Sequence, residues 1–170
     1  MTKTRILLVN DTPVHVGKLR DALAAQGFEV VAEVHSAIEL PQAVAAFRPD
    51  VVIVDAESPS RDTLEQIAAT NACAPRPIVM FTEAREQAMI RAAVQAGVTA
   101  YVVDGLSPSR LQPLLDVAVA RFQEEQQLRS KLESTERQLA ERKLVEKAKG
   151  ILIDKRGMTE EAAYQLLRTT

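Results

Sequence analysis

Short hydrophobic runs alternate with stretches of helical periodicity through the first part of the chain. Each run is bounded by turn-forming or polar residues, and most are rich in valine and isoleucine. Such runs are typical of strands buried on both faces of a parallel sheet. They are Ile6–Val9, Val30–Val34, Val51–Val54, Ile78–Phe81 and Tyr101–Val103. Strand and helix repeated in this order predict an α/β fold with a five-stranded, doubly wound parallel sheet over residues 1–122.

Capping residues mark several of the predicted helix boundaries. Ser36 followed by Glu39 has the form of a capping box, which predicts that the second helix begins there. Gly97 predicts the end of the fourth helix. Ser107 and Pro108 predict the start of the fifth, as N-cap and first helical residue.

The fifth helix is predicted to continue far beyond the sheet. No proline follows Leu114 and no glycine occurs until Gly150, so nothing in the sequence ends the helix before about Lys155. Such a helix is about 70 Å long at 1.5 Å per residue. A globular core cannot cover that length, so the helix must leave the domain.

A leucine stripe and alternating charges occupy the section over residues 123–138. The charges are spaced by four residues, which supports an exposed helix: Glu125, Arg129, Glu133, Arg137 and Glu141. The stripe has the 4-3-4 spacing of a coiled-coil seam: Leu128, Leu132, Thr135 and Leu139. We therefore expect a homodimer through this helix. The alternative is a solvated single helix that carries a chance stripe.

Residues 139–170 have a broader apolar face and predict a small helical domain. The face consists of Leu144, Val145, Ala148, Ile151 and Leu152. A break at Gly157 and a cap at Thr159 then start a last helix, whose apolar residues can fold back onto that face. This hairpin has few core residues and looks too small to be stable alone.

Charge is divided unevenly along the chain. The whole sequence has a net charge of −2, whereas residues 1–136 have −5 and residues 137–156 have +4. Five of the seven cations of this basic segment form a strip on one helix, and they predict an anionic partner: Arg142, Lys143, Lys147, Lys149 and Arg156. Tyr164 could stack on a nucleic-acid base. The alternatives are a solvated helix face and a tyrosine that belongs to the core.

Other features of the sequence concern location and chemistry. A single cysteine, Cys73, and the lack of a signal peptide or a long apolar run predict a cytoplasmic protein that does not enter the membrane. No nucleophile–base pair and no phosphate loop occur, so we do not expect an enzyme.

Polar residues follow the predicted strands at the edge where open α/β sheets carry their sites. They are Asn10, Asp11, Asp55, Thr82 and Asp104. Asp11 and Asp55 could hold Mg²⁺, an ion that prefers oxygen ligands, although no cofactor is expected to be required. The alternative is ordinary capping of strand ends.

These residues give the first domain a resemblance to the receiver domains of bacterial response regulators, over about residues 4–122. The resemblance identifies Asp55 in VVIVD with the phosphoacceptor and Asp11 in LLVND with one acid of the metal-binding pair. It also identifies Thr82 in VMFT with the switch hydroxyl and Tyr101 with the switch aromatic residue.

Two positions depart from the receiver pattern. Asn10 stands where the family usually has an acid, and Asp104 stands where it has a lysine that pairs with the phosphorylated aspartate. A carboxylate at Asp104 repels phosphate, so we predict that phosphorylation is not the main switch. A conventional regulator switched by phosphorylation of Asp55 is the alternative.

The segment LAERKLVEKAKGILIDKRGMTEEAAYQLLR, residues 139–168, resembles an ANTAR domain, the RNA-binding module of transcription antitermination regulators. Together with VNDTP and AYVVDGL, it makes the chain similar to nitrate-responsive regulators of the NasT type. The resemblance implies binding to two neighbouring hairpins of a leader RNA, and control by a nitrate-binding partner protein. ANTAR domains have three helices, so the domain is expected to lack its third helix and to bind RNA weakly. A coiled-coil interaction protein without RNA activity is the remaining alternative.

Overall fold

The computed structural model describes residues 3–10, 16–103 and 108–168, in two compact units, Met1–Gln123 and Glu124–Thr170. In chain order the elements are β1 (Arg5–Asn10), α1 (Val16–Ala25), β2 (Glu29–Val34), the 3₁₀ turn η1 (Ala37–Glu39), α2 (Leu40–Phe47), β3 (Val51–Asp55), α3 (Arg61–Cys73), β4 (Ile78–Thr82), α4 (Gln87–Gln95), β5 (Ala100–Val103), α5 (Pro108–Arg156) and α6 (Glu160–Arg168).

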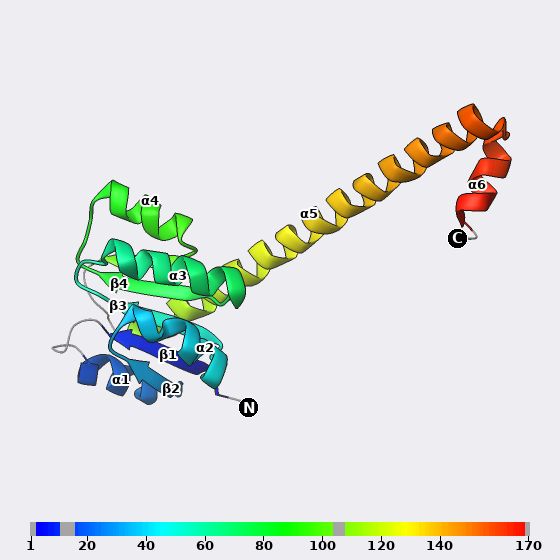
Figure 1. Cartoon of the computed structure of the whole chain (residues 1–170). Helices are drawn as coiled ribbons and strands as arrows, with labels where there is room; N and C mark the ends of the chain where they lie inside the picture. Colours follow the sequence, from blue (N-terminus) through cyan, green and yellow to red (C-terminus); the bar gives the residue numbers. More distant parts are fainter. Residues whose placement is uncertain (1–2, 11–15, 104–107, 169–170) are drawn as a thin grey trace. The chain divides into compact units, whose positions relative to one another are not determined.

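The first unit is built on a five-stranded sheet with the order β2-β1-β3-β4-β5. Every neighbouring pair of strands is parallel, and the register shifts only between Ile6 and Leu7, where β1 pairs with β2. This arrangement confirms the predicted fold class. Figure 1 shows the strands of this sheet among the helices of the first unit. Each strand lies within one residue of its predicted bounds at either end.

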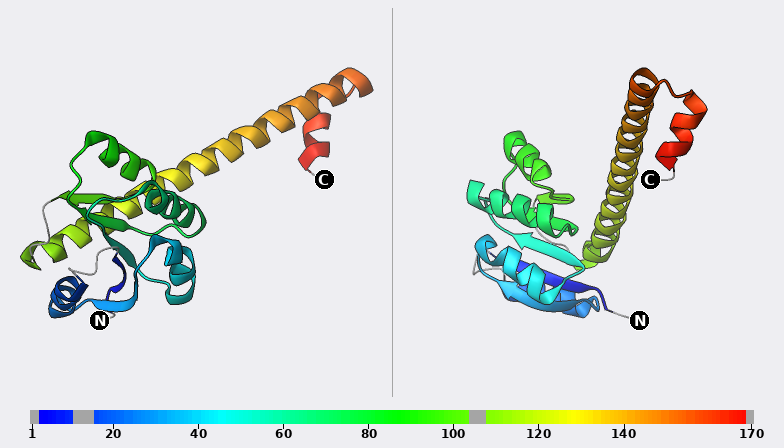
Figure 2. Two further views of the ribbon diagram at one scale, coloured as in Figure 1. Left: turned by 60° about the vertical axis from the view of Figure 1, so that its left-hand side comes forward. Right: turned by 45° about the vertical axis from the view of Figure 1, so that its right-hand side comes forward.

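Helices cover both faces of the sheet, because alternate residues of each central strand point to opposite faces. Ile6 and Leu8 of β1 are fully buried in a cluster formed with α1 and the start of α5. Leu7 and Val9 belong to a second cluster, formed with α2, α3 and α4. Figure 2 shows the helices of this unit on the two sides of the strands.

The start of the second helix differs from the prediction. Ser36 does act as a cap, and its hydroxyl accepts a hydrogen bond from the Ile38 amide, but the first turn is the 3₁₀ turn η1. Pro41 has no N–H with which to bond back to Ala37, so the Leu40 amide takes that carbonyl instead. The α-helix therefore begins at Leu40.

Gly97 ends α4 in a Schellman motif, as the sequence predicts for a C-cap glycine. Its φ is +98°, its amide donates to the Val94 carbonyl at 3.0 Å, and the Val98 amide donates to the Ala93 carbonyl at 3.0 Å. Gly27 ends α1 with the same pair of hydrogen bonds and a φ of +85°. The two motifs provide a matched pair of glycines.

The second unit contains the C-terminal part of α5, followed by α6. Gly157, with φ +60°, ends α5 by donating its amide to the Ile153 carbonyl at 3.0 Å. The chain then turns back, and α6 begins at Glu160 (Figure 2). Among the described residues of this unit, Ala163 alone is buried. In the described part of the chain no helix is apolar and long enough to span a membrane.

Candidate functional site

The first candidate site lies at the carboxyl edge of the sheet. Asn10 and Asp55 end the neighbouring strands β1 and β3 and are partners in the parallel register. Thr82 ends β4, the next strand. Asn10 and Thr82 are buried and Asp55 is half-buried. Two other predicted site residues, Asp11 and Asp104, lie outside the described residues.

Thr82 and Tyr101 connect the loops at this edge by hydrogen bonds. The Thr82 hydroxyl donates to the Glu57 carbonyl at 2.9 Å and accepts from the Ala84 amide at 3.1 Å. The Tyr101 hydroxyl donates to the Ala84 carbonyl at 2.9 Å. The sequence did not indicate the roles of Glu57 and Ala84, because main-chain groups carry no residue-type signature.

Burial changes the acidity of Tyr101. Loss of solvent raises the pKa of its hydroxyl, because the phenolate would be poorly hydrated. The nearby Thr82 hydroxyl partly offsets this rise in pKa, and the negative charge of Glu86 adds to it. Tyr101 therefore stays a neutral hydrogen-bond donor through the physiological pH range.

The described donors at this edge suit a magnesium ion only in part. Asn10 offers a carboxamide oxygen and Asp55 a carboxylate, and both are hard oxygen ligands of the kind Mg²⁺ takes. No cluster of three or more histidine, cysteine or acidic side chains with metal-binding geometry occurs among the described residues. Mg²⁺ binding at Asp55 and Asp11 stays a prediction.

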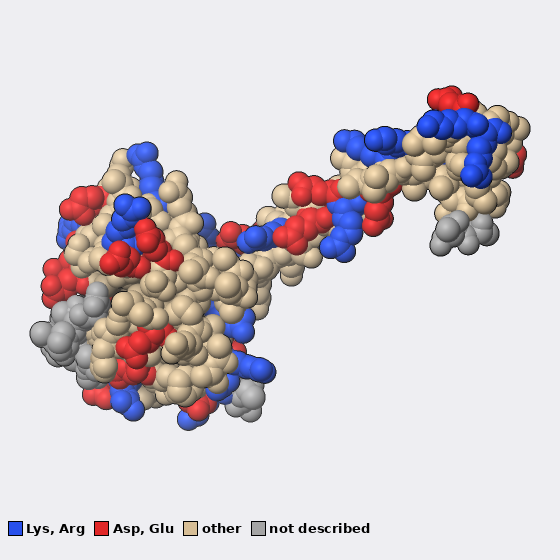
Figure 3. Space-filling view, viewed as in Figure 1, with Lys and Arg blue, Asp and Glu red and all other residues tan. Residues whose placement is uncertain are grey.

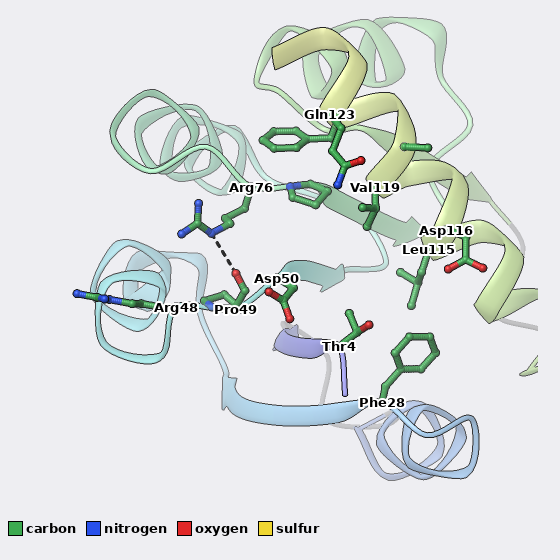
Figure 4. A pocket seen from close by; sticks show the side chains of 13 residues that line it. Thr4, Phe28, Arg48, Pro49, Asp50, Arg76, Leu115, Asp116, Val119 and Gln123 are labelled. Carbon is green, nitrogen blue, oxygen red and sulfur yellow. Dashed lines mark hydrogen bonds between the residues drawn. The ribbon is translucent and has the colours of Figure 1, made fainter. Parts of the chain in front are cut away.

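A cavity of about 590 Å³ lies at the opposite, amino edge of the sheet. Figure 4 shows Phe28, Leu115 and Val119 on its apolar side and Asp50 near the strand starts. The Arg76 side chain lines it as well, with Nε donating to the Pro49 carbonyl at 3.0 Å. The sequence did not indicate this cavity, because its lining comes from distant segments that share no motif.

The second candidate site is the basic segment of α5. Arg142, Lys143, Lys147 and Arg156 are exposed, and Figure 3 shows lysine and arginine side chains gathered near the C-terminal end of this helix. Tyr164 on α6 is 49% exposed. These five side chains are available to a partner.

Lys149 is placed differently from the other cations of the strip. Its side chain is only 13% exposed, and its Nζ lies 3.0 Å from Glu160 Oε1 and 3.2 Å from Glu146 Oε1. Glu160, followed by Glu146, raises the pKa of the Lys149 amine, because both carboxylates stabilise its charged form. Glu160 was not among the predicted site residues.

The predicted seam residues are exposed on α5. Leu128, Leu132 and Leu139 are 61%, 59% and 53% exposed. Arg129 pairs with Glu133 at 3.3 Å beside the stripe, in the i,i+4 arrangement that supports a lone helix as well as a coiled coil. The stripe is therefore open to a second helix.

Two family models match the chain. The response regulator receiver domain matches residues 6–116, and the ANTAR domain matches residues 126–170. The transcriptional regulatory protein PdtaR of Mycobacterium tuberculosis is 33% identical over 164 residues, which cover 96% of this chain and 80% of PdtaR. The chemotaxis protein CheY of Bacillus subtilis is 31% identical over 110 residues, which cover 63% of this chain and 90% of CheY.

Solved structures share the fold of the first unit. The receiver domain of a modulated diguanylate cyclase from Desulfovibrio desulfuricans has a TM-score of 0.65 at 21% identity, and the match covers 73% of this chain and 99% of that one. The chain thus belongs to the response regulators. It joins a receiver domain to an ANTAR domain, and together with its similarity to PdtaR this supports a role in transcription regulation.

Proposed function

We propose that this protein is an RNA-binding regulator of transcription antitermination, and that it contacts RNA through the basic segment of α5. The observation that carries the proposal is the set of four exposed cations, Arg142, Lys143, Lys147 and Arg156, within the stretch matched by the ANTAR domain. The rest of the chain is acidic, with a net charge of −5 over residues 1–136.

Electrostatics supports this segment as the RNA contact. Cations that neutralise phosphates release bound counterions, which favours binding and makes it weaken with added salt. The acidic receiver is repelled by the same phosphates. Base recognition in RNA uses unstacked loop bases, and the exposed ring of Tyr164 offers a surface on which such a base can stack. We therefore assign the target as a hairpin loop RNA, with tandem leader hairpins as the first choice.

The receiver is proposed to respond to a partner protein rather than mainly to phosphorylation. Asp104, a carboxylate where receivers have a lysine, would repel a phosphoryl group on Asp55. Asn10 stands where receivers usually have an acid of their metal-binding pair, and it is the register partner of Asp55 on the neighbouring strand. A nitrate-binding sensor is the partner that the sequence resemblance suggests testing first.

Assembly is proposed to occur between two copies through α5. Leu128, Leu132 and Leu139 are more than half exposed on one stripe, and a second copy presents the same stripe. Pairing two such stripes in a coiled coil removes these side chains from water. A second copy of the chain is sufficient for this, and no other protein is needed. A dimer would also present two basic segments to a tandem RNA target.

The decisive experiment measures RNA binding at several salt concentrations. A leader RNA with two neighbouring hairpins is titrated with the chain and with a variant that changes Arg142, Lys143 and Lys147 to Gln. We expect the variant to lose most of its affinity, and the slope of log affinity against log salt to shrink by roughly two to three units, at about 0.7–0.9 unit per lost phosphate contact.

A matched control changes Arg129 and Lys131 to Gln, in the section of α5 where acids and bases alternate and outside residues 137–156. This control removes exposed cations from the same helix, and we expect nearly unchanged binding. Equal loss in the control and the variant would show that general charge, rather than the basic segment, carries the binding.

The proposal for the receiver has its own experiment. The chain is treated with a small phosphodonor and Mg²⁺, and RNA affinity and oligomeric state are compared with those of untreated chain and of Asp55→Ala. We expect little difference. A stable phosphoprotein with a large change in either property, lost in Asp55→Ala, would establish a conventional phosphorylation switch.

A further inference from the structure

The α5 and α6 helices bury little apolar surface against each other, so a cluster of ion pairs is important for the position of α6. Ala163 is the buried residue of α6, and Leu152 and Leu167 are half-buried. Leu144, Ile151 and Leu166 remain between 42% and 67% exposed. The hydrophobic contact between the two helices is therefore slight, and polar contacts account for a large share of what positions α6.

Lys149 makes an ion pair that crosses from α5 to α6. It stands eleven residues before Glu160, and the turn at Gly157 brings the first residue of α6 back to it. Its ammonium group reaches Glu160 at 3.0 Å and Glu146, on its own helix, at 3.2 Å. Glu160 also lies in the first turn of α6, where the helix dipole favours a negative charge.

These contacts make Lys149 poorly suited to bind a phosphate. Two carboxylates already occupy donors of its ammonium group, and they would repel an approaching phosphate. The other four cations of the strip are exposed, whereas the Lys149 side chain is 13% exposed. Its location within the basic segment therefore does not make it an RNA contact.

We propose that Lys149 is a positioning residue, which fastens α6 to α5 through Glu160 and so holds the RNA-binding surface in place. This inference rests on the proposed RNA-binding function. The fastened position of α6 fixes where Tyr164 lies with respect to the exposed cations of α5. Glu160 therefore favours RNA binding because it holds α6 in position. Its negative charge alone would oppose the approach of RNA.

The sign of one substitution separates this role from simple electrostatics. Glu160→Gln removes a negative charge beside the basic segment, so charge alone predicts tighter RNA binding. Loss of the fastening predicts weaker binding, by roughly two- to fivefold, which is the range of a single exposed ion pair. Glu161→Gln is the matched control, since Glu161 is the next residue of α6, is exposed, and forms no ion pair with a described residue.

The experiment compares the whole chain with Glu160→Gln, Glu161→Gln and Lys149→Gln. RNA affinity is measured against salt, and amide hydrogen exchange of α6 is measured without RNA. We expect weaker binding and faster exchange in Glu160→Gln and Lys149→Gln, with the salt slope of the parent. Glu161→Gln should exchange like the parent and bind RNA at least as tightly.

Other results would overturn the assignment. If Glu160→Gln binds as tightly as Glu161→Gln, the ion pair with Glu160 does not support RNA binding. If Lys149→Gln lowers the salt slope by about 0.7–0.9 unit, Lys149 contacts phosphate and does not act through α6. If the parent binds no RNA, the proposed function fails. Amide hydrogen exchange then becomes the test of whether Lys149 fastens α6 to α5. In that case faster α6 exchange in Glu160→Gln than in Glu161→Gln supports it, and equal exchange refutes it.

Discussion

Replacing Gly97 with alanine should destabilise the receiver much more than the same change at Gly27. Both glycines end helices in Schellman motifs with positive φ, so alanine at either position incurs roughly 1–2 kcal/mol of backbone strain. The two positions differ in the space around them. A Cβ at Gly97 would overlap Asn71 Nδ2 and lie 2.8 Å from its Cγ, whereas no described residue other than its chain neighbours lies within 4 Å of one at Gly27.

The steric overlap gives the magnitude of the difference. Forcing extra atoms into a packed site costs about 1–3 kcal/mol, so strain and overlap together should cost Gly97→Ala about 2–5 kcal/mol of unfolding free energy. Alanine also restricts the unfolded chain, by about 0.4–1 kcal/mol, but this contribution is common to both variants and cancels in their difference. Gly27→Ala should therefore lose about 1–3 kcal/mol less than Gly97→Ala.

A urea series with hydrogen exchange read by mass spectrometry measures this difference. Peptides from β1, β3 and β4 report on unfolding of the receiver core separately from the long helix, which would dominate an optical signal. Asn71→Ala in the Gly97→Ala background is the rescue variant. It removes Nδ2 and Cγ and leaves Cβ at 3.3 Å from the added atom, and the buried Asn71 Oδ1 accepts no hydrogen bond from described residues. Most of the overlap cost should therefore be recovered.

Two results would refute this reasoning. Equal losses in Gly27→Ala and Gly97→Ala would mean that backbone strain accounts for the whole effect. Failure of Asn71→Ala to recover stability would mean that the overlap is not with its side chain.

Three further predictions concern other parts of the chain. Thr82→Val should lower the unfolding free energy of the receiver by about 1–3 kcal/mol, measured by the same exchange method, because the Glu57 carbonyl and the Ala84 amide lose their partner. Because the pKa of Lys149 is raised, its contribution to the α5–α6 contact is fully present below the ordinary lysine pKa and is lost as pH rises through the higher pKa of the folded state. An NMR titration of the Lys149 side chain should give a midpoint above that of an unpaired lysine. Changing Leu132 and Leu139 to Lys should abolish self-association in light scattering at tens of micromolar, a range in which modest interfaces still associate, and a monomeric parent chain would contradict the proposed seam.

The sequence predicted the strands and the long helix well, because their signals are local. Short apolar runs, most of them rich in valine and isoleucine, marked all five strands to within one residue at either end, and the lack of a helix breaker marked α5 to within one residue of Arg156. The start of α2 was placed too early. There the capping signal of Ser36 was correct, but Pro41 converts the turn that follows into η1.

The sequence was less informative about individual contacts in the candidate sites. It indicated that Asn10, Asp55 and Thr82 lie at one edge of the sheet, because parallel strands in this order bring their carboxyl ends together. It could not show that Lys149 faces Glu160, because that contact depends on how the chain turns at Gly157. Spacing within α5 grouped Lys149 with four cations that the structure leaves exposed.

The cavity at the amino edge of the sheet has a consequence for chemical probes of this protein. β3 separates the cavity from Asp55, and its five residues span about 16 Å at 3.3 Å each. A small molecule seated between Phe28 and Val119 would therefore touch α5 and the strand starts but not the acidic edge (Figure 4). Compounds selected for this cavity would discriminate between regulators by residues that play no part in phosphate chemistry, so they need not cross-react with receivers that share the same acidic edge.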